Sequence, residues 1–167
     1  MKKIGLLSDT HGYIHEEVPR IFKDCDEIWH AGDFGNLNVA QKLQKINLLR
    51  GVYGNIDDTS VRMEYPQYLR FTCEEVDVLI THIGGYPGNY TPLVKEIMKT
   101  EPPGLFICGH SHILKVIYDK KYNCLHINPG AAGKNGFHQV ITMIRLIIDG
   151  SNIKDLEIIE FPRNENK

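Results

Sequence analysis

The stretch KIGLLSDTHG, residues 3–12, decides the fold of this chain. Its apolar first half predicts a short buried strand, and its second half places Asp9 and His11 one residue apart in a polar loop. A second stretch, LFICGHSH (residues 105–112), has the same plan, with an apolar run followed by His110 and His112. Each stretch therefore predicts a strand followed by side chains that can donate oxygen or nitrogen atoms to a ligand. Whether the two stretches lie close together depends on the fold.

The sequence between these stretches repeats the arrangement of apolar run and polar loop. Apolar residues predict strands over 27–30 and 48–53, and their spacing predicts an amphipathic helix over 37–46. This order of strand, loop and helix is typical of parallel strands joined by crossover helices. Asp33 and Asn55 follow the two strands, at the carboxyl ends where open α/β sheets bind their ligands.

The rest of the chain consists mostly of predicted strands. His82 follows one of them, and a helix is expected to begin at Pro92 with Thr91 as its N-cap. The residue pattern alone predicts an α/β part followed by a β-rich part, within a single domain over residues 1–163 and with a polar tail over 164–167. The further expected strands are 68–72, 76–81, 105–108, 116–119, 124–127, 140–148 and 153–161, and another helix is expected over 16–23.

Length and composition exclude several classes of protein. A chain of 167 residues suits one domain, and a net charge of −2 without a basic run argues against a general nucleic-acid surface. The apolar run over residues 4–7 is too short for a signal peptide, and no run reaches the roughly 18 residues of a membrane span. The four widely spaced cysteines predict reduced thiols, so we expect a cytoplasmic protein without membrane attachment.

Seven side chains with oxygen or nitrogen donors stand just after predicted strands, and they would converge if these strands share one sheet. Each alone has an ordinary structural role available, because Asp9 could cap a turn and Asn55 could occupy a left-handed turn. Together they are too many for one tetrahedral zinc ion and suit two ions about 3.5–4 Å apart, as in many phosphatases and nucleases. Mixed imidazole, carboxylate and amide donors favour transition metals over calcium. The seven residues are Asp9, His11, Asp33, Asn55, His82, His110 and His112.

Five short motifs resemble the ordered motifs of the calcineurin-like metallophosphoesterase superfamily. They are SDTHG (8–12), HAGD (30–33), YGNID (53–57), THIGG (81–85) and GHSH (109–112). INPGAAG (127–133) resembles a stretch found in the small prokaryotic phosphodiesterase branch of that superfamily. The resemblance implies an α+β fold of the αββα type, in which two mixed β-sheets pack as a sandwich with helices on the outer faces.

The resemblance also implies roles for the seven side chains. Asp33 would bridge two divalent transition-metal ions, with manganese expected first and iron, zinc, nickel or cobalt as alternatives. Because alternate residues of an extended segment point to opposite sides, His110 and His112 could serve different ions. Asp9, His11 and His112 would hold one ion, Asn55, His82 and His110 would hold the other, and the expected catalytic residues are Asp33, Asn55 and His82.

The activity implied is that of a hydrolase acting on a small phosphate ester. We expect a phosphodiesterase in which a metal-bridging hydroxide attacks phosphorus in line. Ile56 stands where many relatives have a His, so the protonation of the leaving group stays open. Two alternatives also stay open, namely a phosphomonoesterase or nucleotide hydrolase, and a metal-binding scaffold for protein interactions with the same fold. The sequence leaves homo-oligomer formation open as well.

Four further side chains are expected around the site. Asp57 would orient a metal ligand, and Tyr86 would form a wall of the substrate pocket by stacking on a base or aryl group. His30 would support the site or be simply buried, and Asn128 would lie behind or at its rim. The remaining histidines are expected in the core (His126) or at the surface and rim (His15 and His138).

Overall fold

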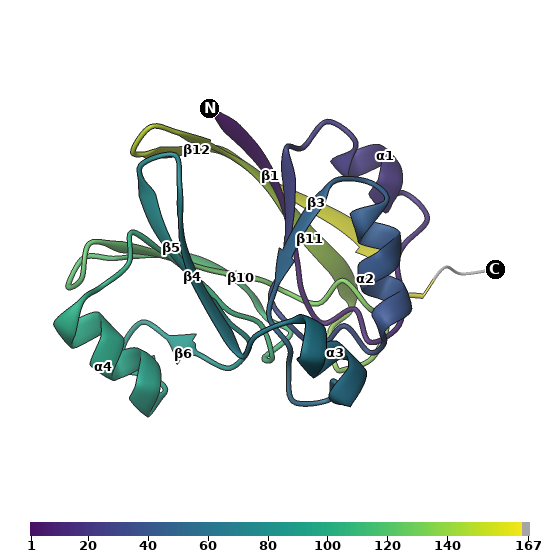
Figure 1. Cartoon of the computed structure of the whole chain (residues 1–167), viewed down its shortest axis with the longest axis horizontal. Helices are drawn as coiled ribbons and strands as arrows, with labels where there is room; N and C mark the ends of the chain where they lie inside the picture. The colour runs from purple at the N-terminus through teal and green to yellow at the C-terminus, as the bar shows by residue number, and fades with distance from the viewer. Residues whose placement is uncertain (165–167) are drawn as a thin grey trace.

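Two five-stranded mixed β-sheets form the computed structural model of this chain, which describes residues 1–164 (Figure 1). The strand order is β12-β11-β1-β2-β3 in the first sheet and β4-β5-β8-β10-β9 in the second. The first sheet comprises β1 (Lys2–Leu7), β2 (Glu27–His30), β3 (Leu48–Gly51), β11 (Val140–Asp149) and β12 (Asn152–Pro162). The second comprises β4 (Tyr68–Cys73), β5 (Val76–Thr81), β8 (Leu105–Ile107), β9 (Leu114–Asp119) and β10 (Cys124–Pro129). A separate hairpin pairs β6 (Gly85–Tyr86) with β7 (Asn89–Tyr90).

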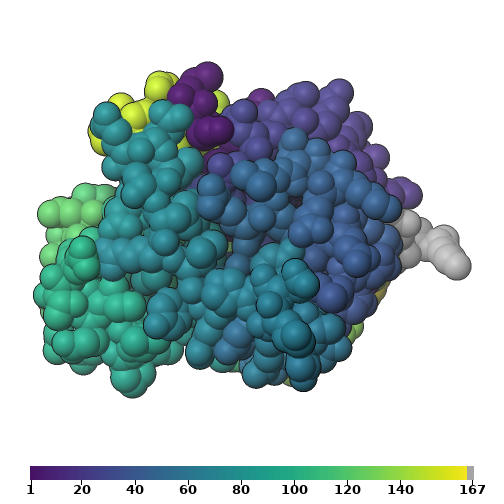
Figure 2. All heavy atoms as spheres, in the orientation of Figure 1, coloured from purple at the N-terminus to yellow at the C-terminus, as the bar shows by residue number. Residues whose placement is uncertain are grey.

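The sheets pack face to face because their central strands are apolar on both faces. Ile4 and Leu6 of β1 lie in one buried cluster with Val78 and Ile80 of β5, between the two sheets. Leu7, the next residue of β1, belongs instead to a cluster on the outer face of the first sheet. Strands buried on both faces read as continuous apolar runs, as β1 does. Side chains close the space between the ribbons, as the space-filling view shows (Figure 2).

Helices cover both outer faces of the sandwich. On the first sheet, Phe22 packs so closely over Gly5 that a Cβ there would lie 2.7 Å from the ring. On the second sheet, Val94 and Met98 pack against Phe106 of β8. The helices of the first sheet are α1 (Val18–Phe22), α2 (Leu37–Gln44) and α3 (Thr59–Glu64), and the helix of the second is α4 (Pro92–Thr100). The α+β sandwich with outer helices is therefore confirmed.

Some local expectations hold and others are wrong. The three strands β1, β2 and β3 are parallel neighbours, as the order of strands and helices predicts. Helix α3 and the β6–β7 hairpin are absent from the elements that the sequence predicts. Thr91 precedes α4, but its side chain makes no capping hydrogen bond. Residues 165–167 of the predicted polar tail lie outside the described residues.

The topology sets the place of the site. The seven candidate ligands do not lie at the edge of one sheet, because β1, β2 and β3 belong to the first sheet and β5 and β8 to the second. They lie where the carboxyl ends of both sets of strands meet. Within residues 1–164, no helix is long and apolar enough to cross a membrane.

Candidate metal centre

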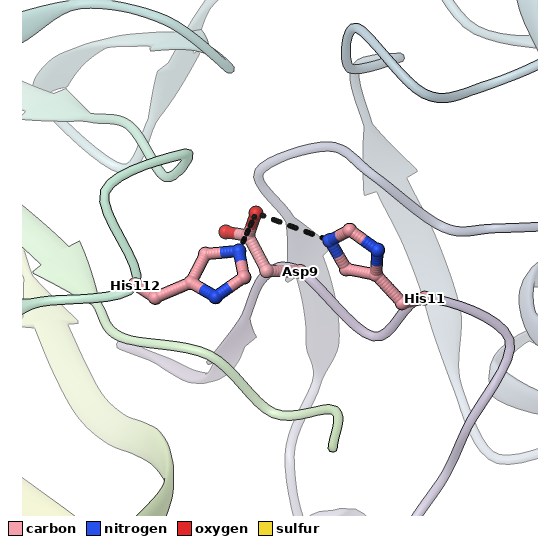
Figure 3. Close-up of side chains that lie close together, drawn as sticks. All are labelled: Asp9, His11 and His112. Carbon is pink, nitrogen blue, oxygen red and sulfur yellow. Dashed lines mark ion pairs between the residues drawn. The ribbon is translucent and has the colours of Figure 1, made fainter. Parts of the chain in front are cut away.

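A first group of donor atoms joins the loop after β1 to the segment after β8. Asp9 Oδ1 lies 3.1 Å from His112 Nε2 and 3.8 Å from His11 Nε2. Figure 3 shows the carboxylate between the two imidazole rings. Each of the three residues offers one donor atom, and these atoms lie within 4.8 Å of one another. The stretches 3–12 and 105–112 thus meet in one group.

A second group lies after β2, β5 and β8. Asp33, His82 and His110 each offer one donor atom, again within 4.8 Å of one another. The Nε2 atom of His82 lies 3.1 Å from Asp33 Oδ2, and the rings of His82 and His110 stand edge to face with centroids 5.3 Å apart. This group also takes members from both sheets, because Asp33 follows β2 and the two histidines follow β5 and β8.

Asp33 connects the two groups. Its Oδ2 atom lies 3.4 Å from His11 Nε2 in the first group, and 3.1 Å from His82 Nε2 in its own. His82 Nε2 is in turn 3.8 Å from Asp9 Oδ1. The carboxylate of Asp33 therefore faces both groups, as a ligand shared by two ions must.

Hydrogen bonds fix the orientation of several donor atoms. His82 Nδ1 lies 2.8 Å from the carbonyl oxygen of Ala31, so Nδ1 carries the proton and Nε2 presents its lone pair to the site. Asp9 Oδ2 accepts hydrogen bonds from Ser8 Oγ at 2.7 Å and from the backbone N–H of His110 at 3.1 Å. In the described part of the chain, Asp9 Oδ1, His11 Nε2 and His82 Nε2 are buried without a hydrogen-bond partner. Since buried polar atoms are normally paired, these orphaned donors fit bound cations.

The backbone of the site is strained. Left-handed φ angles are uncommon for residues other than glycine, and they concentrate at functional sites. The φ angles of His110 (70°) and His112 (60°) are left-handed, so this segment is not extended. The prediction that the alternation of an extended segment separates these two side chains is therefore wrong. Five of the seven candidates have positive φ: Asp9 (54°), His11 (46°), Asp33 (59°), His110 (70°) and His112 (60°).

Opposite charges shift the pKa values within the site. Burial by itself would raise the pKa of Asp9, but contacts with His11 and His112 hold it well below its usual range. The pKa of His11 rises to about 9, mainly through Asp33 and then Asp9. Burial opposes a charge on His82, yet Asp33 raises its pKa as well. Without a metal ion, His11 is therefore protonated at neutral pH, and a bound metal ion would replace that proton.

His30 and Asn128 support the loops from behind. The fully buried His30 accepts a hydrogen bond from the N–H of Gly32 at 3.1 Å, and its Nε2 lies 2.9 Å from Thr10 Oγ1. Burial lowers the pKa of His30 to about 3, so the ring is neutral and links the loops that carry Asp9 and Asp33. Asn128 Nδ2 donates to the carbonyl of Gly109 at 2.9 Å, which anchors the segment before His110.

Asp57 acts on backbone rather than on a ligand side chain. Its carboxylate accepts hydrogen bonds from the N–H groups of Phe34 (3.1 Å), Gly35 (2.8 Å) and Gly54 (2.8 Å). It thereby joins the loop of Asp33 to the loop of Asn55. Its contacts are with the backbone of these two loops, and the role of Asp57 in orienting a metal ligand stays a prediction. His15 differs from its predicted place at the surface, because it is buried and stacked on Phe161 with ring centroids 3.9 Å apart.

Asn55 lies at the tip of a loop packed against Asp33. The backbone N–H of Ile56 donates to Asp33 Oδ1 at 3.1 Å, and a Cβ on Gly54 would lie 2.0 Å from that same oxygen. The side chain of Asn55 is exposed and lines a cavity together with His82. Ile56 is 45% exposed, so an apolar side chain faces solvent next to Asn55.

A cavity beside His110 contains residues that sequence reasoning missed. Tyr86, predicted as a pocket wall, lines it together with Tyr90 and Lys115. The last two belong to no motif, and no spacing in the sequence signals them. Lys115 reaches the cavity only because β9 pairs with β10 at the edge of the second sheet.

Comparison with known proteins agrees with this fold and donor set. The sequence profile of the calcineurin-like phosphoesterase superfamily domain matches residues 1–151, and the chain belongs to this family of metal-dependent hydrolases. It is 29% identical over 161 residues to a "probable metallophosphoesterase" of Methanothermobacter thermautotrophicus, covering 93% of this chain and 91% of that protein.

Solved structures show the same fold at low sequence identity. An archaeal phosphodiesterase superposes with a TM-score of 0.71 at 22% identity, covering 94% of this chain and 99% of the other. Vps29 from Chaetomium thermophilum superposes with a TM-score of 0.73 at 14% identity, and the match covers 98% of this chain and 100% of the other. These similarities support the fold. The chemistry of the site depends on the residues described above.

Proposed function

We propose that this chain is a phosphodiesterase that uses two divalent transition-metal ions, manganese first among them, to hydrolyse a small phosphodiester. The observation that carries the proposal is the pair of donor groups that meet at Asp33, whose Oδ2 lies 3.4 Å from His11 Nε2 and 3.1 Å from His82 Nε2. The archaeal phosphodiesterase of the same fold supports the choice of diesters over monoesters.

The donor groups suggest which residues hold each ion. Asp33 would be shared between the ions, and Asn55 would join the second group from the adjacent loop. Two such ions would supply Lewis acidity toward the phosphate and a water of lowered pKa. One ion would take Asp9, His11 and His112, and the other would take His82 and His110, together with Asn55.

The chain's own residues would bind and orient the substrate rather than form a covalent bond to it. The Ala31 carbonyl keeps His82 Nε2 turned toward the site, and Asp57 holds the loops of Asp33 and Asn55 together. Two divalent ions outweigh the carboxylates of Asp9 and Asp33, so the loaded site would attract an anionic phosphate without a basic patch. Ile56 offers no titratable group, which favours diesters whose leaving group needs little protonation.

The test combines metal content with hydrolysis of bis(p-nitrophenyl) phosphate. Asp33→Asn should lower manganese-dependent turnover by more than about 100-fold, beyond the 10–100-fold typical of a residue that only supports a ligand. Asp24→Asn makes the same chemical change at an exposed position and should leave turnover unchanged. Full activity of Asp33→Asn would refute the proposal.

The same experiment separates the alternatives. Faster hydrolysis of p-nitrophenyl phosphate than of the diester would favour a phosphomonoesterase. Fewer than two bound ions after reconstitution, with no hydrolysis, would favour a scaffold.

The four free, buried cysteines agree with a reducing compartment such as the cytoplasm.

A further inference from the structure

A cavity of about 430 Å³ opens beside the second donor group. Gly109 and His110 form its end next to the metal centre, and the β6–β7 hairpin and strands β9 and β10 form its walls. We call it the side cavity and define it by Tyr86, Tyr90, Ile113, Lys115 and His126. A phosphate bound at the donor groups would have one ester substituent close to this space, and the volume falls within the range of small-molecule sites.

Two tyrosines give the side cavity aromatic walls that differ in their contacts and exposure. The hydroxyl of Tyr90 donates to Asp119 Oδ2 at 2.6 Å, and its ring packs edge to face with Phe106, so this wall is fixed. Tyr86 is 45% exposed on the short hairpin, and Lys115 Nζ lies 4.2 Å from the centroid of its ring. Because the ammonium group occupies one face of Tyr86, the ring is held in place while part of it remains accessible.

His126 adds an unused polar group to this aromatic surface. It is only 1% exposed, and its Nδ1 has no hydrogen-bond partner among residues 1–164. Burial, and then the charge of Lys115, lower its pKa to about 4, so the ring is neutral at physiological pH. A neutral imidazole offers one donor and one acceptor, and a buried polar atom without a partner is unusual unless a ligand or water supplies one.

We propose that the side cavity binds a planar aromatic ring carried by the phosphoester, with Tyr86 stacking on the ring and His126 hydrogen-bonding to its edge. This inference rests on the proposed function, because the phosphate must sit at the donor groups for the ring to reach the cavity. A nucleobase can make both contacts, whereas an unsubstituted aryl group shares only the stacking on Tyr86. An aliphatic ester group would leave both the aromatic face and the imidazole nitrogen unused.

Matched phosphonates test the proposal by binding rather than by turnover. Phenylphosphonate and methylphosphonate share the anionic head and differ only in the ring, so calorimetric titration of the manganese-loaded protein measures what the ring contributes. Phenylphosphonate should bind roughly tenfold more tightly, in keeping with base–aromatic stacking. Tyr86→Ala should reduce that ratio to about twofold or less and leave methylphosphonate binding unchanged.

The matched control is Tyr118→Ala. Tyr118 is 55% exposed on the same strand as Lys115, but it lines a different cavity together with Asn123. Its replacement should leave the phenyl preference intact. Equal binding of the two phosphonates to the wild-type protein, or a preference that survives Tyr86→Ala, would overturn the proposal.

His126→Phe distinguishes the two sources of the ring, since it keeps the packing against Phe106 and removes both nitrogens. A roughly fivefold loss for uridine 5′-monophosphate, the effect of about one hydrogen bond, with phenylphosphonate unchanged would identify a nucleobase. Unchanged binding of both ligands would overturn the hydrogen bond to His126 and leave stacking of an aryl group on Tyr86. A thermal melt checks that the variant folds.

The outcomes also separate this inference from the proposed function. Metal-dependent diester hydrolysis without any ring preference overturns the side cavity alone. The opposite case is a phenyl preference that is lost in Tyr86→Ala, together with diester hydrolysis that is retained in Asp33→Asn. This result overturns the proposed function alone.

Discussion

Gly54→Ala adds one methyl group next to the carboxylate that joins the two donor groups. A Cβ at this position would lie 2.0 Å from Asp33 Oδ1 and 2.5 Å from the Asp33 backbone nitrogen. Ordinary contact begins at 3.4 Å, so the carboxylate or the loop must move by about 1.4 Å (3.4 − 2.0). Gly54 is not among the residues with positive φ, so the effect is steric rather than a strain of the backbone.

The expected loss of activity is much larger than the loss of stability. A misplacement of about 1 Å in a catalytic site costs roughly 100-fold, so kcat/KM for bis(p-nitrophenyl) phosphate should fall by about that factor or more. Overpacking by one methyl group costs about 1–3 kcal/mol. For a domain of this size that corresponds to roughly 2–12 °C in Tm, so the variant remains folded at 25 °C.

The assay compares manganese-dependent kcat/KM with Tm from circular dichroism. Gly104→Ala is the matched control, because its Cβ would lie 3.5 Å from Val76 Cγ1, an ordinary contact far from the site. The control should retain activity. If Gly54→Ala kept its activity within threefold, Asp33 could not be positioned as the structure shows, and the reasoning would fail.

Three further predictions concern the support and electrostatics of the site. Asp57→Ala leaves three backbone N–H groups without their acceptor and should cost at least about 3 kcal/mol in chemical denaturation. Asp58→Ala removes the cap of α3 and an exposed hydrogen bond from Ser60, and it should cost clearly less. Because the pKa of His11 is raised to about 9 from an ordinary 6.5, its stabilisation is complete below pH 6.5 and is lost as the pH rises through 9. The Tm of EDTA-treated protein should therefore fall over this range, whereas manganese affinity should rise because neutral imidazole binds metal; an unchanged Tm would contradict the assignment. Burial raises the pKa of all four thiols, so DTNB should label Cys25, Cys73, Cys108 and Cys124 only after unfolding, and fast labelling of the native protein would refute their burial.

The sequence predicts where the strands and helices of this fold lie along the chain better than it predicts which strands pair in each sheet. Runs such as residues 3–7 and 27–30 are apolar because both of their faces are buried, and that pattern suffices to predict parallel neighbours in β1 and β2. It cannot assign β5 and β8 to a second sheet, because pairing between distant strands leaves no periodic signal. The short helix α3 buries only Val61, so its residues show no apolar period to detect.

The candidate site shows a similar division. The donor types and their order after the strands predict that they converge, since strand ends meet at the edge of a sheet. The left-handed backbone at His110 and His112 was not predictable, because it depends on contacts such as the Asn128 anchor on Gly109. The place of Lys115 was not predictable for the same reason, because only tertiary packing brings it over Tyr86.

The origin of the candidate ligands in two sheets has a mechanical consequence. Each donor group combines residues that follow strands of the first sheet with residues that follow strands of the second. A bound ion would therefore act as a cross-link that fastens one end of the sandwich, next to the bond from His82 to Ala31. Loading the site should slow amide hydrogen exchange at the ends of β2 and β8 together, although these strands belong to different sheets. Metal content would then set the stiffness of the whole seam between the sheets as well as the chemistry at its edge.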